Sequence, residues 1–426
     1  MANGSSTRQE NRALVALCGV TIQLILGTVY AWSVFNKPLA VHGWSSKSIT
    51  VTFELAIFFQ GLSAALGGRF VDRAGARKIA MISAALFGLG TILAGVADSI
   101  GSLWLLWIGY GVIAGIGNGL GYITPIAVLV RWFPEKKGLI TGMAVMGFGL
   151  GAALMSQIAP ILILHLGVAK TFYISGVFYF VVMMLVAQKL NNPPAGWVAP
   201  QPAVTAKKAA APVASVDFAG ALSMPQFYIL WVVLFLNISA GIALISNLSP
   251  IAQEQVGLGA IAAGTLVSVC SLFNGLGRIF WAAISEKIGR KPVFLLILGT
   301  QVPLLFILPH ISSVVLFCVI CCYIFACYGG GFAVMPSFAA ETFGPKNIGS
   351  IYGKILLAWG LGGIVGPMNI EWSGTFSKAL AISGCTLLVG FVIATLYRKP
   401  RLAPLPLDMR VGTLAATAKA SDAVKQ

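Results

Sequence analysis

Three polar residues share one face of an otherwise apolar stretch, residues 261–284. Ser271, Asn274 and Arg278 are spaced i, i+3 and i+7, so an α-helix places them in one stripe. At the ~1.5 Å rise of a helix, Arg278 lies roughly 12 Å before the polar run 285–291, close to the middle of a hydrocarbon core about 30 Å thick. An unpaired arginine at that depth costs at least a few kcal/mol and cannot lose its proton. The stripe predicts a site where Arg278 grips a small carboxylate and Asn274 adds a neutral hydrogen bond.

Polar and aromatic side chains in other apolar segments are candidates for the walls of this site. Tyrosine suits a small hydroxy- or keto-acid because it joins an apolar ring to a polar tip. The wall candidates are Gln23, Tyr30, Asn118, Tyr122, Tyr328 and Phe332. The alternative for Arg278 is a structural arginine bonded to helix-end carbonyls. For each wall candidate the alternative is ordinary interhelical packing.

The composition predicts a membrane protein. The 426 residues are 58% hydrophobic and only 9% charged, whereas soluble domains are typically about 25% charged. Apolar segments long enough to span a membrane recur, without the short alternating segments of a β-barrel. They are residues 13–35, 49–70, 79–97, 103–130, 139–164, 171–190, 227–245, 261–284, 292–308, 314–335, 348–370 and 379–397. We expect an all-α integral membrane protein with twelve transmembrane helices.

The net charge of +16 would suggest a nucleic-acid partner in a soluble protein, but here the basic residues alternate between loops. They cluster near residues 8–12, 69–78, 131–137, 207–208, 287–291 and 398–401. The loops predicted on the opposite side of the membrane hold only Lys37, Lys47, Lys170 and Lys378. The positive-inside rule then places both termini and the central linker in the cytoplasm of a protein in the cell membrane. Nucleic acid is not an expected partner.

An internal duplication divides the chain. The polar, proline-rich interval 191–226 is predicted to be a cytoplasmic linker between six-helix bundles at 13–190 and 227–397, with a short N-terminal segment 1–12 and a tail 398–426. Pro134 and Gly138 recur as Pro345 and Gly349 at identical spacing. Two related halves are typical of transporters that rock one half against the other.

The loops after the second and eighth segments carry the same acid, base, glycine and base order, which resembles the loop signature of the major facilitator superfamily. The matching residues are Asp72, Arg73, Gly75 and Arg77 in the first half and Glu286 and Arg290 in the second. The resemblance covers both halves and implies the major facilitator fold, with this motif as a charge network that stabilises one gating state. The alternative is a plain solvated basic turn.

A narrower resemblance begins at Arg131-Trp132-Phe133-Pro134, continues to Gly142, and is similar to the helix 4–5 signature of monocarboxylate transporters and the oxalate/formate antiporter family. It implies that Arg278 is the substrate arginine of the eighth span. The oxalate-exchanging branch is expected to carry a second deep cation in the eleventh span, where this chain has Trp359; Lys354 lies only about a turn inside. One deep cation favours a monocarboxylate such as lactate or pyruvate, with an oxalate/formate-type exchanger as the alternative.

The sequence leaves the coupling open. Proton-coupled relatives are expected to carry an aspartate where this chain has Asn274, so a proton could instead accompany the substrate. Glu54, roughly 27 Å from Asp72 along a helix, lies near the external surface and is interpreted as an interfacial hydrogen-bonding group rather than the proton carrier.

Other classes of function are disfavoured. No nucleotide motif, metal cluster or cofactor site is evident, the seven cysteines are interpreted as packed thiols, and no nucleophile–base cluster predicts an enzyme. A carboxylate sensor that does not transport is the alternative from another class, and the short, low-complexity linker 191–226 and tail 398–426 argue against it. We expect a monomer in the lipid bilayer whose partners are a small organic anion and protons.

Overall fold

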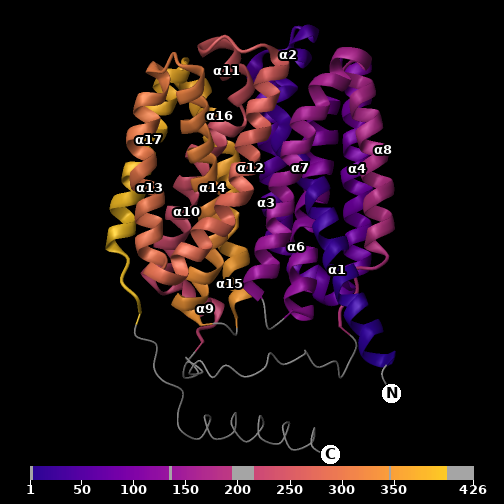
Figure 1. The fold of residues 1–426 in the computed structure, drawn as a ribbon, viewed down its shortest axis with the longest axis vertical. Coiled ribbons are helices and arrows are strands. Elements are labelled where there is room, and N and C mark those ends of the chain that lie inside the picture. The colour runs from indigo at the N-terminus through magenta and orange to yellow at the C-terminus, as the bar shows by residue number, and fades with distance from the viewer. Residues whose placement is uncertain (1–2, 134–136, 194–214, 345–346, 401–426) are drawn as a thin grey trace, which may run out of the picture.

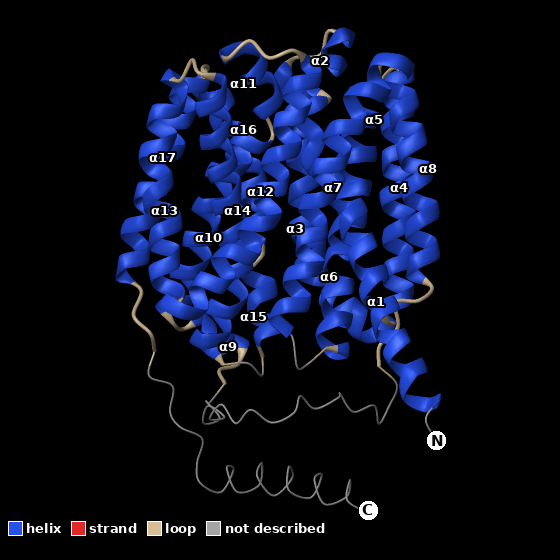
Figure 2. Cartoon of the chain, in the orientation of Figure 1, coloured by secondary structure: helices blue, strands red, loops and turns tan. Residues whose placement is uncertain are grey.

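The computed structural model describes residues 3–133, 137–193, 215–344 and 347–400, and in this part of the chain the regular structure is helical, without strands (Figure 1, Figure 2). Twelve helical spans, from Arg12–Val34 to Phe376–Leu396, are long and apolar enough to cross a membrane. The prediction of twelve spans is confirmed.

The first six spans form the N-terminal half. Its helices are α1 (Asn3–Gly27), the 3₁₀ turn η1 (Thr28–Val34), α2 (Asn36–Leu39), the 3₁₀ turn η2 (Ala40–His42), α3 (Ser46–Ala74), α4 (Ala76–Ile100), α5 (Leu103–Leu106), the π-helical η3 (Trp107–Ala114), α6 (Gly115–Trp132), α7 (Lys137–Leu166) and α8 (Val168–Ala187).

The last six spans form the C-terminal half. Its helices are α9 (Phe218–Leu222), α10 (Pro225–Ile245), α11 (Leu248–Gln255), α12 (Ala260–Ile288), α13 (Arg290–Ile307), the 3₁₀ turn η5 (Leu308–His310), α14 (Val314–Phe343), α15 (Ile348–Ile355), α16 (Leu357–Ser373) and α17 (Phe376–Leu396). The interval predicted as linker therefore includes α9, and its Val216 N–H donates to the carbonyl of Phe343. The part of the linker at residues 194–214 lies outside the described residues.

Three spans that the sequence predicts as continuous helices are irregular. The first ends in η1, the fourth contains η3, and the eleventh is divided at Leu356 between α15 and α16. At that division the Trp359 N–H donates to the Leu356 carbonyl at 2.9 Å, a tighter turn than the α-helical pattern. Interrupted helices in transporters commonly lie at the substrate site.

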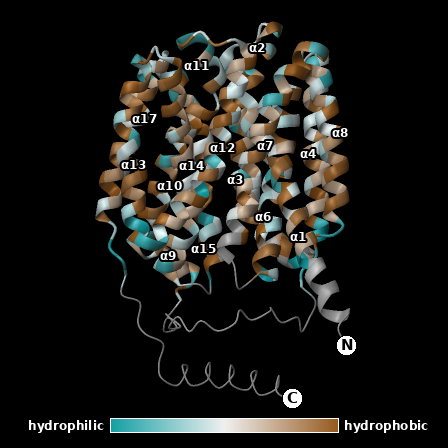
Figure 3. Ribbon diagram, viewed as in Figure 1, coloured by the Kyte–Doolittle hydropathy of each residue, from teal (hydrophilic) through white to brown (hydrophobic). Residues whose placement is uncertain are grey.

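The two ends of the bundle are distinguished by the chain termini. The start of α1 and the end of α17 lie at the same end of the bundle, which we call the terminal face. The other end, where α2 and α11 lie, is the opposite face (Figure 1). Between the faces, hydrophobic residues cover outer helices such as α8, α13 and α17, while hydrophilic residues gather toward the ends (Figure 3). This distribution is what a bilayer-embedded bundle requires.

The two halves meet along two pairs of helices, α3 with α16 and α7 with α12. At the α3–α16 contact, a Cβ added to Gly61 would lie 2.6 Å from the backbone nitrogen of Gly360. Only glycine allows the two backbones to approach this closely. The seam between the halves is therefore tightly packed at this level.

The duplicated loop motif has the same backbone conformation in both halves. Gly75 joins α3 to α4 with φ 88° and ψ 147°, and Gly289 joins α12 to α13 with φ 94° and ψ 162°. Positive φ of this kind is available to glycine at little cost. The repeat in the sequence is thus a repeat in the structure.

Candidate functional site

Arg278 is buried on α12, with 2% of its surface exposed. Its Nε donates to Asn274 Oδ1 at 3.3 Å, while its buried Nη1 has no hydrogen-bond partner. No carboxylate among the described residues forms an ion pair with it. A buried guanidinium without a counter-charge is a large local positive potential and an anchor for an anion.

Asn274 lies one turn before Arg278 on the same face of α12, as the spacing predicts. Its amide oxygen accepts from the guanidinium, so it orients the arginine rather than leaving that oxygen for a ligand. Ser271, the third member of the stripe, is buried and donates to the Val267 carbonyl of its own helix at 2.8 Å. The three residues therefore share one face of α12, but of the three only Arg278 has a buried donor without a hydrogen-bond partner.

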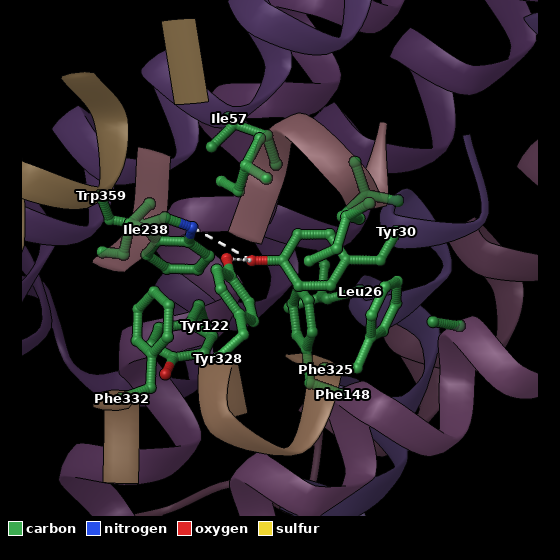
Figure 4. Close-up of a cluster of buried hydrophobic side chains, with 14 of the residues drawn as sticks. Leu26, Tyr30, Ile57, Tyr122, Phe148, Ile238, Phe325, Tyr328, Phe332 and Trp359 are labelled. Atoms are coloured by element: carbon green, nitrogen blue, oxygen red, sulfur yellow. Dashed lines mark hydrogen bonds between the residues drawn. The ribbon is translucent and has the colours of Figure 1, made fainter. Parts of the chain in front are cut away.

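Aromatic side chains from both halves form a buried cluster, shown in Figure 4, and several of its members interact with Arg278. Tyr30 of η1 and Tyr328 of α14 have their hydroxyl oxygens 2.6 Å apart, and the Trp359 Nε1–H of α16 donates to the Tyr30 hydroxyl at 3.1 Å. The Tyr30 ring also packs edge-on against Phe148 of α7, with centroids 5.0 Å apart. These contacts join the halves beside Arg278.

A second group of rings lies directly against the arginine. The Phe332 ring centroid is 5.5 Å from Arg278 Cζ, a cation–π contact. Tyr122 interacts electrostatically with Arg278 and packs against Trp359 at 5.1 Å between centroids. Tyr352 of α15 also interacts electrostatically with Arg278, from the terminal-face side of the break in the eleventh span.

Sequence reasoning identified four of these seven aromatic residues and missed three. Tyr352, Phe148 and Trp359 were not among the candidates for the site. Tyr352 lies two residues before Lys354 on α15. The break in the helix at Leu356 brings it toward Arg278, and the apolar run of the sequence does not predict that break. Phe148 lies in a glycine-rich segment that resembles packing surface.

Gln23 and Asn118 face each other's helices instead of the arginine. The Gln23 amide donates to the Tyr122 carbonyl at 2.8 Å, and the Asn118 amide donates to the Leu26 carbonyl at 2.9 Å. Their NH₂ groups are therefore engaged in tying α1 to α6, and their buried carbonyl oxygens have no partner. Contact of these two residues with a substrate stays a prediction.

The duplicated loop motif, for which the resemblance predicts a gating role, lies at the terminal face, away from Arg278. In the second half, Arg290 Nε donates to Glu341 Oε1 of α14 at 2.9 Å, while Glu286 is exposed. In the first half, Arg77 hydrogen-bonds the Gln188 side chain at the end of α8, and Arg73 is exposed. The side chain of Asp72 lies outside the described residues. The described contacts of the motif link helices within each half.

Further polar contacts join the two halves at the opposite face. The buried Asn36 amide donates to the Ser246 carbonyl at 2.9 Å. Two ion pairs accompany it: Lys37 with Glu254 at 3.5 Å, and Lys47 with Glu371 at 3.2 Å. Together with the Tyr30–Tyr328 hydrogen bond at the level of the buried site, these contacts join the two halves. The opposite face is held closed in this conformation.

This arrangement can bind a small anion with one charged contact and an aromatic enclosure. A carboxylate could accept from the guanidinium at Nη1, and the neighbouring rings of Phe332, Trp359 and Phe148 would surround its carbon chain with apolar side chains. No group of three or more metal-ligating side chains occurs among the described residues.

Comparison with known proteins identifies the family. Residues 13–367 match the family model described as Major Facilitator Superfamily. The chain is 30% identical over 364 residues to the uncharacterized MFS-type transporter YhjX of Escherichia coli, covering 84% of this chain and 87% of the relative. It is 30% identical over 387 residues to the oxalate:formate antiporter of Oxalobacter formigenes, covering 87% and 88%. An alignment of 517 residues relates it at 28% identity to apicoplast pyruvate carrier 1 of Toxoplasma gondii, covering 94% and 92%.

A solved structure supports the fold. The chain superimposes on a bacterial homologue of the human lysosomal transporter Spinster, in an inward-facing and unoccupied conformation, with a TM-score of 0.63 and 16% identity over 91% of this chain and 95% of that one. Both resemblances stated from the sequence are thereby confirmed. The fold and the relatives are those of membrane transporters and not of enzymes, and the chain belongs to the major facilitator superfamily, in the branch that includes the oxalate:formate antiporter.

Proposed function

We propose that this protein is a secondary transporter of small monocarboxylates such as lactate or pyruvate, in which Arg278 binds the carboxylate. The observation that carries the proposal is the unpaired Nη1 of a 2%-exposed arginine, enclosed by rings from both halves. The relatives named as an oxalate:formate antiporter and a pyruvate carrier support this class of substrate.

The single cation favours one carboxylate group over two. Trp359 occupies the position where the resemblance implies a second deep cation in oxalate exchangers, and its indole nitrogen is engaged by Tyr30. Lys354 lies on α15, beyond the break at Leu356 and toward the terminal face. A second carboxylate beside Trp359 would be buried without a counter-charge, which is unfavourable.

We place the terminal face in the cytoplasm and the opposite face outside the cell membrane, because the basic loops gather at the terminal face. The conformation described above is then closed to the outside. Transport follows when the halves rock about the buried site, breaking the Tyr30–Tyr328 and Lys47–Glu371 contacts in one direction. We propose that a proton accompanies the anion, and that the monomer is the working unit.

Uptake of labelled lactate into proteoliposomes under an imposed pH gradient tests this function. We expect accumulation by the native chain and its loss in Arg278→Ala. Arg278→Lys is the matched control, since it keeps the charge but not the planar donor fork, and we expect weakened rather than abolished uptake. Thermal unfolding in detergent verifies that each variant is folded. Accumulation unaffected by Arg278→Ala would contradict the site assignment.

The second candidate is an oxalate/formate-type anion exchanger, favoured by the 30% identity to the oxalate:formate antiporter. The same vesicles distinguish the two. Uptake that requires oxalate or formate inside the vesicles, and that ignores the pH gradient, would replace symport by exchange.

A further inference from the structure

A buried carboxylate, Glu54, interacts electrostatically with a partly buried one, Glu371, across the boundary between the halves. Glu54 of α3 is 6% exposed, and its buried Oε1 has no hydrogen-bond partner. Glu371 of α16 has a side chain that is 12% exposed, and its Oε1 is likewise buried without a partner. The sequence suggested that Glu54 is a hydrogen-bonding group at the interface, but this oxygen makes no such bond.

One cation serves both acids. Lys47 Nζ lies 3.2 Å from Glu371 Oε2, and its side chain is 64% exposed. Among the described residues, Glu371 and Lys47 are the charged groups that interact electrostatically with Glu54. Of the other elements packed on α3, η3 carries Tyr110, which interacts with Tyr179 instead.

The charges in this cluster do not balance when both acids are ionised. Two carboxylates and one lysine leave a net charge of −1, with Glu54 as the acid that has no direct ion pair. A second negative charge nearby and burial both disfavour an ionised carboxylate. The closed arrangement is therefore neutral, and favoured, when one proton is bound to the pair.

Tight packing separates this cluster from the buried site. Along the α3–α16 seam, a Cβ added to Gly363 would lie 2.3 Å from the Ile57 side chain, and Gly61 contacts Gly360 further on. These contacts disfavour passage of a proton from Glu54 toward Arg278. A proton on Glu54 therefore exchanges with the solvent at the opposite face when the halves part.

We propose that Glu54 and Glu371 form a proton-binding site that controls closure of the external gate. In the open state, Glu54 is an ionised carboxylate facing external solvent. An O–H bond forms on Glu54 with a proton from that solvent as the halves close, and the bond breaks when they part, returning the proton to the same side. The external pH thus sets how often the gate is closed, separately from any proton that crosses with the substrate.

This inference rests on the proposed function only for the rocking of the halves and for which face is external. It deepens that function by separating pH regulation from proton coupling. Because the closed state holds one more proton than the open state, the closed-to-open ratio should rise by at most about tenfold for each unit that the pH falls.

Pulsed electron–electron double resonance measures the distance between two spin labels placed across the gate, and it tests the site without any substrate. Labels are placed at Val41 of the N-terminal half and Ser312 of the C-terminal half, both exposed at the opposite face, in a variant whose seven native cysteines are replaced by serine or alanine. Distances are recorded in lipid nanodiscs from about pH 5 to about pH 8, where one-proton linkage changes the ratio measurably. We expect the short distance to gain population as the pH falls.

Variants of the pair identify the groups responsible. Glu54→Gln mimics the protonated acid, so we expect the short distance to dominate at every pH. Glu371→Gln should also abolish the pH response, because the negative charge of Glu54 and the positive charge of Lys47 then balance. The matched control is Glu254→Gln, which breaks the exposed Lys37–Glu254 pair at the same face. It should weaken closure while keeping the pH response.

Two results would overturn the site: distances in the native pair that do not change with pH, or a pH response that survives in Glu54→Gln. Loss of the response in Glu254→Gln as well would overturn it in favour of general surface charge. If the cysteine-free variant is unfolded, counterflow of labelled lactate at low and high external pH compares native, Glu54→Gln and Glu254→Gln chains instead. A protein that fails to transport lactate yet shows the distance response would refute the proposed substrate and leave the proton site standing.

Discussion

The hydroxyl groups of Tyr30 and Tyr328 lie 2.6 Å apart, although 298 residues separate them in the chain. One belongs to the N-terminal half and the other to the C-terminal half, and the Tyr30 oxygen also accepts from Trp359. This short network lies beside the buried Arg278 and must break whenever the halves separate at the opposite face. It therefore couples the conformation of the transporter to the environment of the proposed substrate site at Arg278.

Replacement of Tyr30 by phenylalanine should loosen this closure. It leaves the buried Tyr328 hydroxyl and the buried Trp359 nitrogen without hydrogen-bond partners, and each such group costs about 1–3 kcal/mol. Tyr328→Phe should have a smaller effect, because the Trp359–Tyr30 bond remains. The label pair at Val41 and Ser312 measures the shift toward the open state.

The control for that comparison is Tyr179→Phe. Tyr179 is a buried tyrosine whose hydroxyl donates to the Met155 sulfur at 3.4 Å, within the N-terminal half. Its loss should lower the thermal stability without changing the distance populations. Equal shifts in Tyr179→Phe and Tyr30→Phe would contradict a specific role for the cross-half network.

Replacement of Asn274 by aspartate should make substrate binding depend on pH. The new carboxylate would lie against Arg278 Nε, now 3.3 Å from the Asn274 oxygen, and would compete with the substrate for the guanidinium. We expect KM to rise about tenfold or more at neutral pH, equivalent to about 1.4 kcal/mol, and to recover as falling pH protonates the aspartate.

Asn274→Ala is the control for this effect, since it removes the orienting oxygen without adding charge. Its KM should rise less and show no new pH dependence. Initial uptake rates at several lactate concentrations and pH values give both numbers. A KM in Asn274→Asp that does not improve on acidification would show that the aspartate does not compete for Arg278.

Replacement of Trp359 by lysine should change the selectivity from one carboxylate toward two. A lysine would bring a second cation to the enclosure and remove the donor that holds the Tyr30 hydroxyl. We expect oxalate to compete with labelled lactate at least about tenfold more effectively, because the second carboxylate gains a counter-charge worth about 1.4 kcal/mol or more. Trp359→Phe, which keeps the ring without a charge, should not acquire oxalate competition.

Replacement of Gly61 by valine should block closure of the seam between α3 and α16. The added carbon would lie 2.6 Å from the Gly360 nitrogen, a backbone atom that cannot move independently of its helix. We expect transport to be lost while the chain still folds, since each half keeps its own core. Gly142→Ala is the control, because a Cβ there meets no neighbour within 4 Å, and it should transport normally. Normal lactate counterflow in Gly61→Val would show that this contact is not needed for the cycle.

The twelve spans, the duplication and the buried arginine could all be predicted from the sequence, because the order of residues along the chain is enough to recognise each of them. A run of about twenty apolar residues must become a membrane helix whatever its neighbours. The spacing of Asn274 and Arg278 fixes their common face through the helical repeat alone.

What the other polar residues do could be decided only by tertiary structure. Gln23 and Asn118 have the side-chain chemistry of a binding site, but packing directs their donors to backbone carbonyls. The turns at η1 and Leu356, which carry Tyr30 and Tyr352 to the site, have no distinct apolar pattern. Contacts between helices that are distant in sequence determine these roles, and such contacts cannot be predicted from the residue pattern of a single sequence.

The division between what sequence and tertiary structure decide applies also to two pairs of residues across the halves, Tyr30 with Tyr328 and Glu54 with Glu371. The sequence determined that this protein crosses the membrane twelve times, is built from two related halves and carries one deep cation. Only the folded arrangement brought Tyr30 to Tyr328 and Glu54 to Glu371, because pairing across the halves depends on how two separately formed bundles pack together.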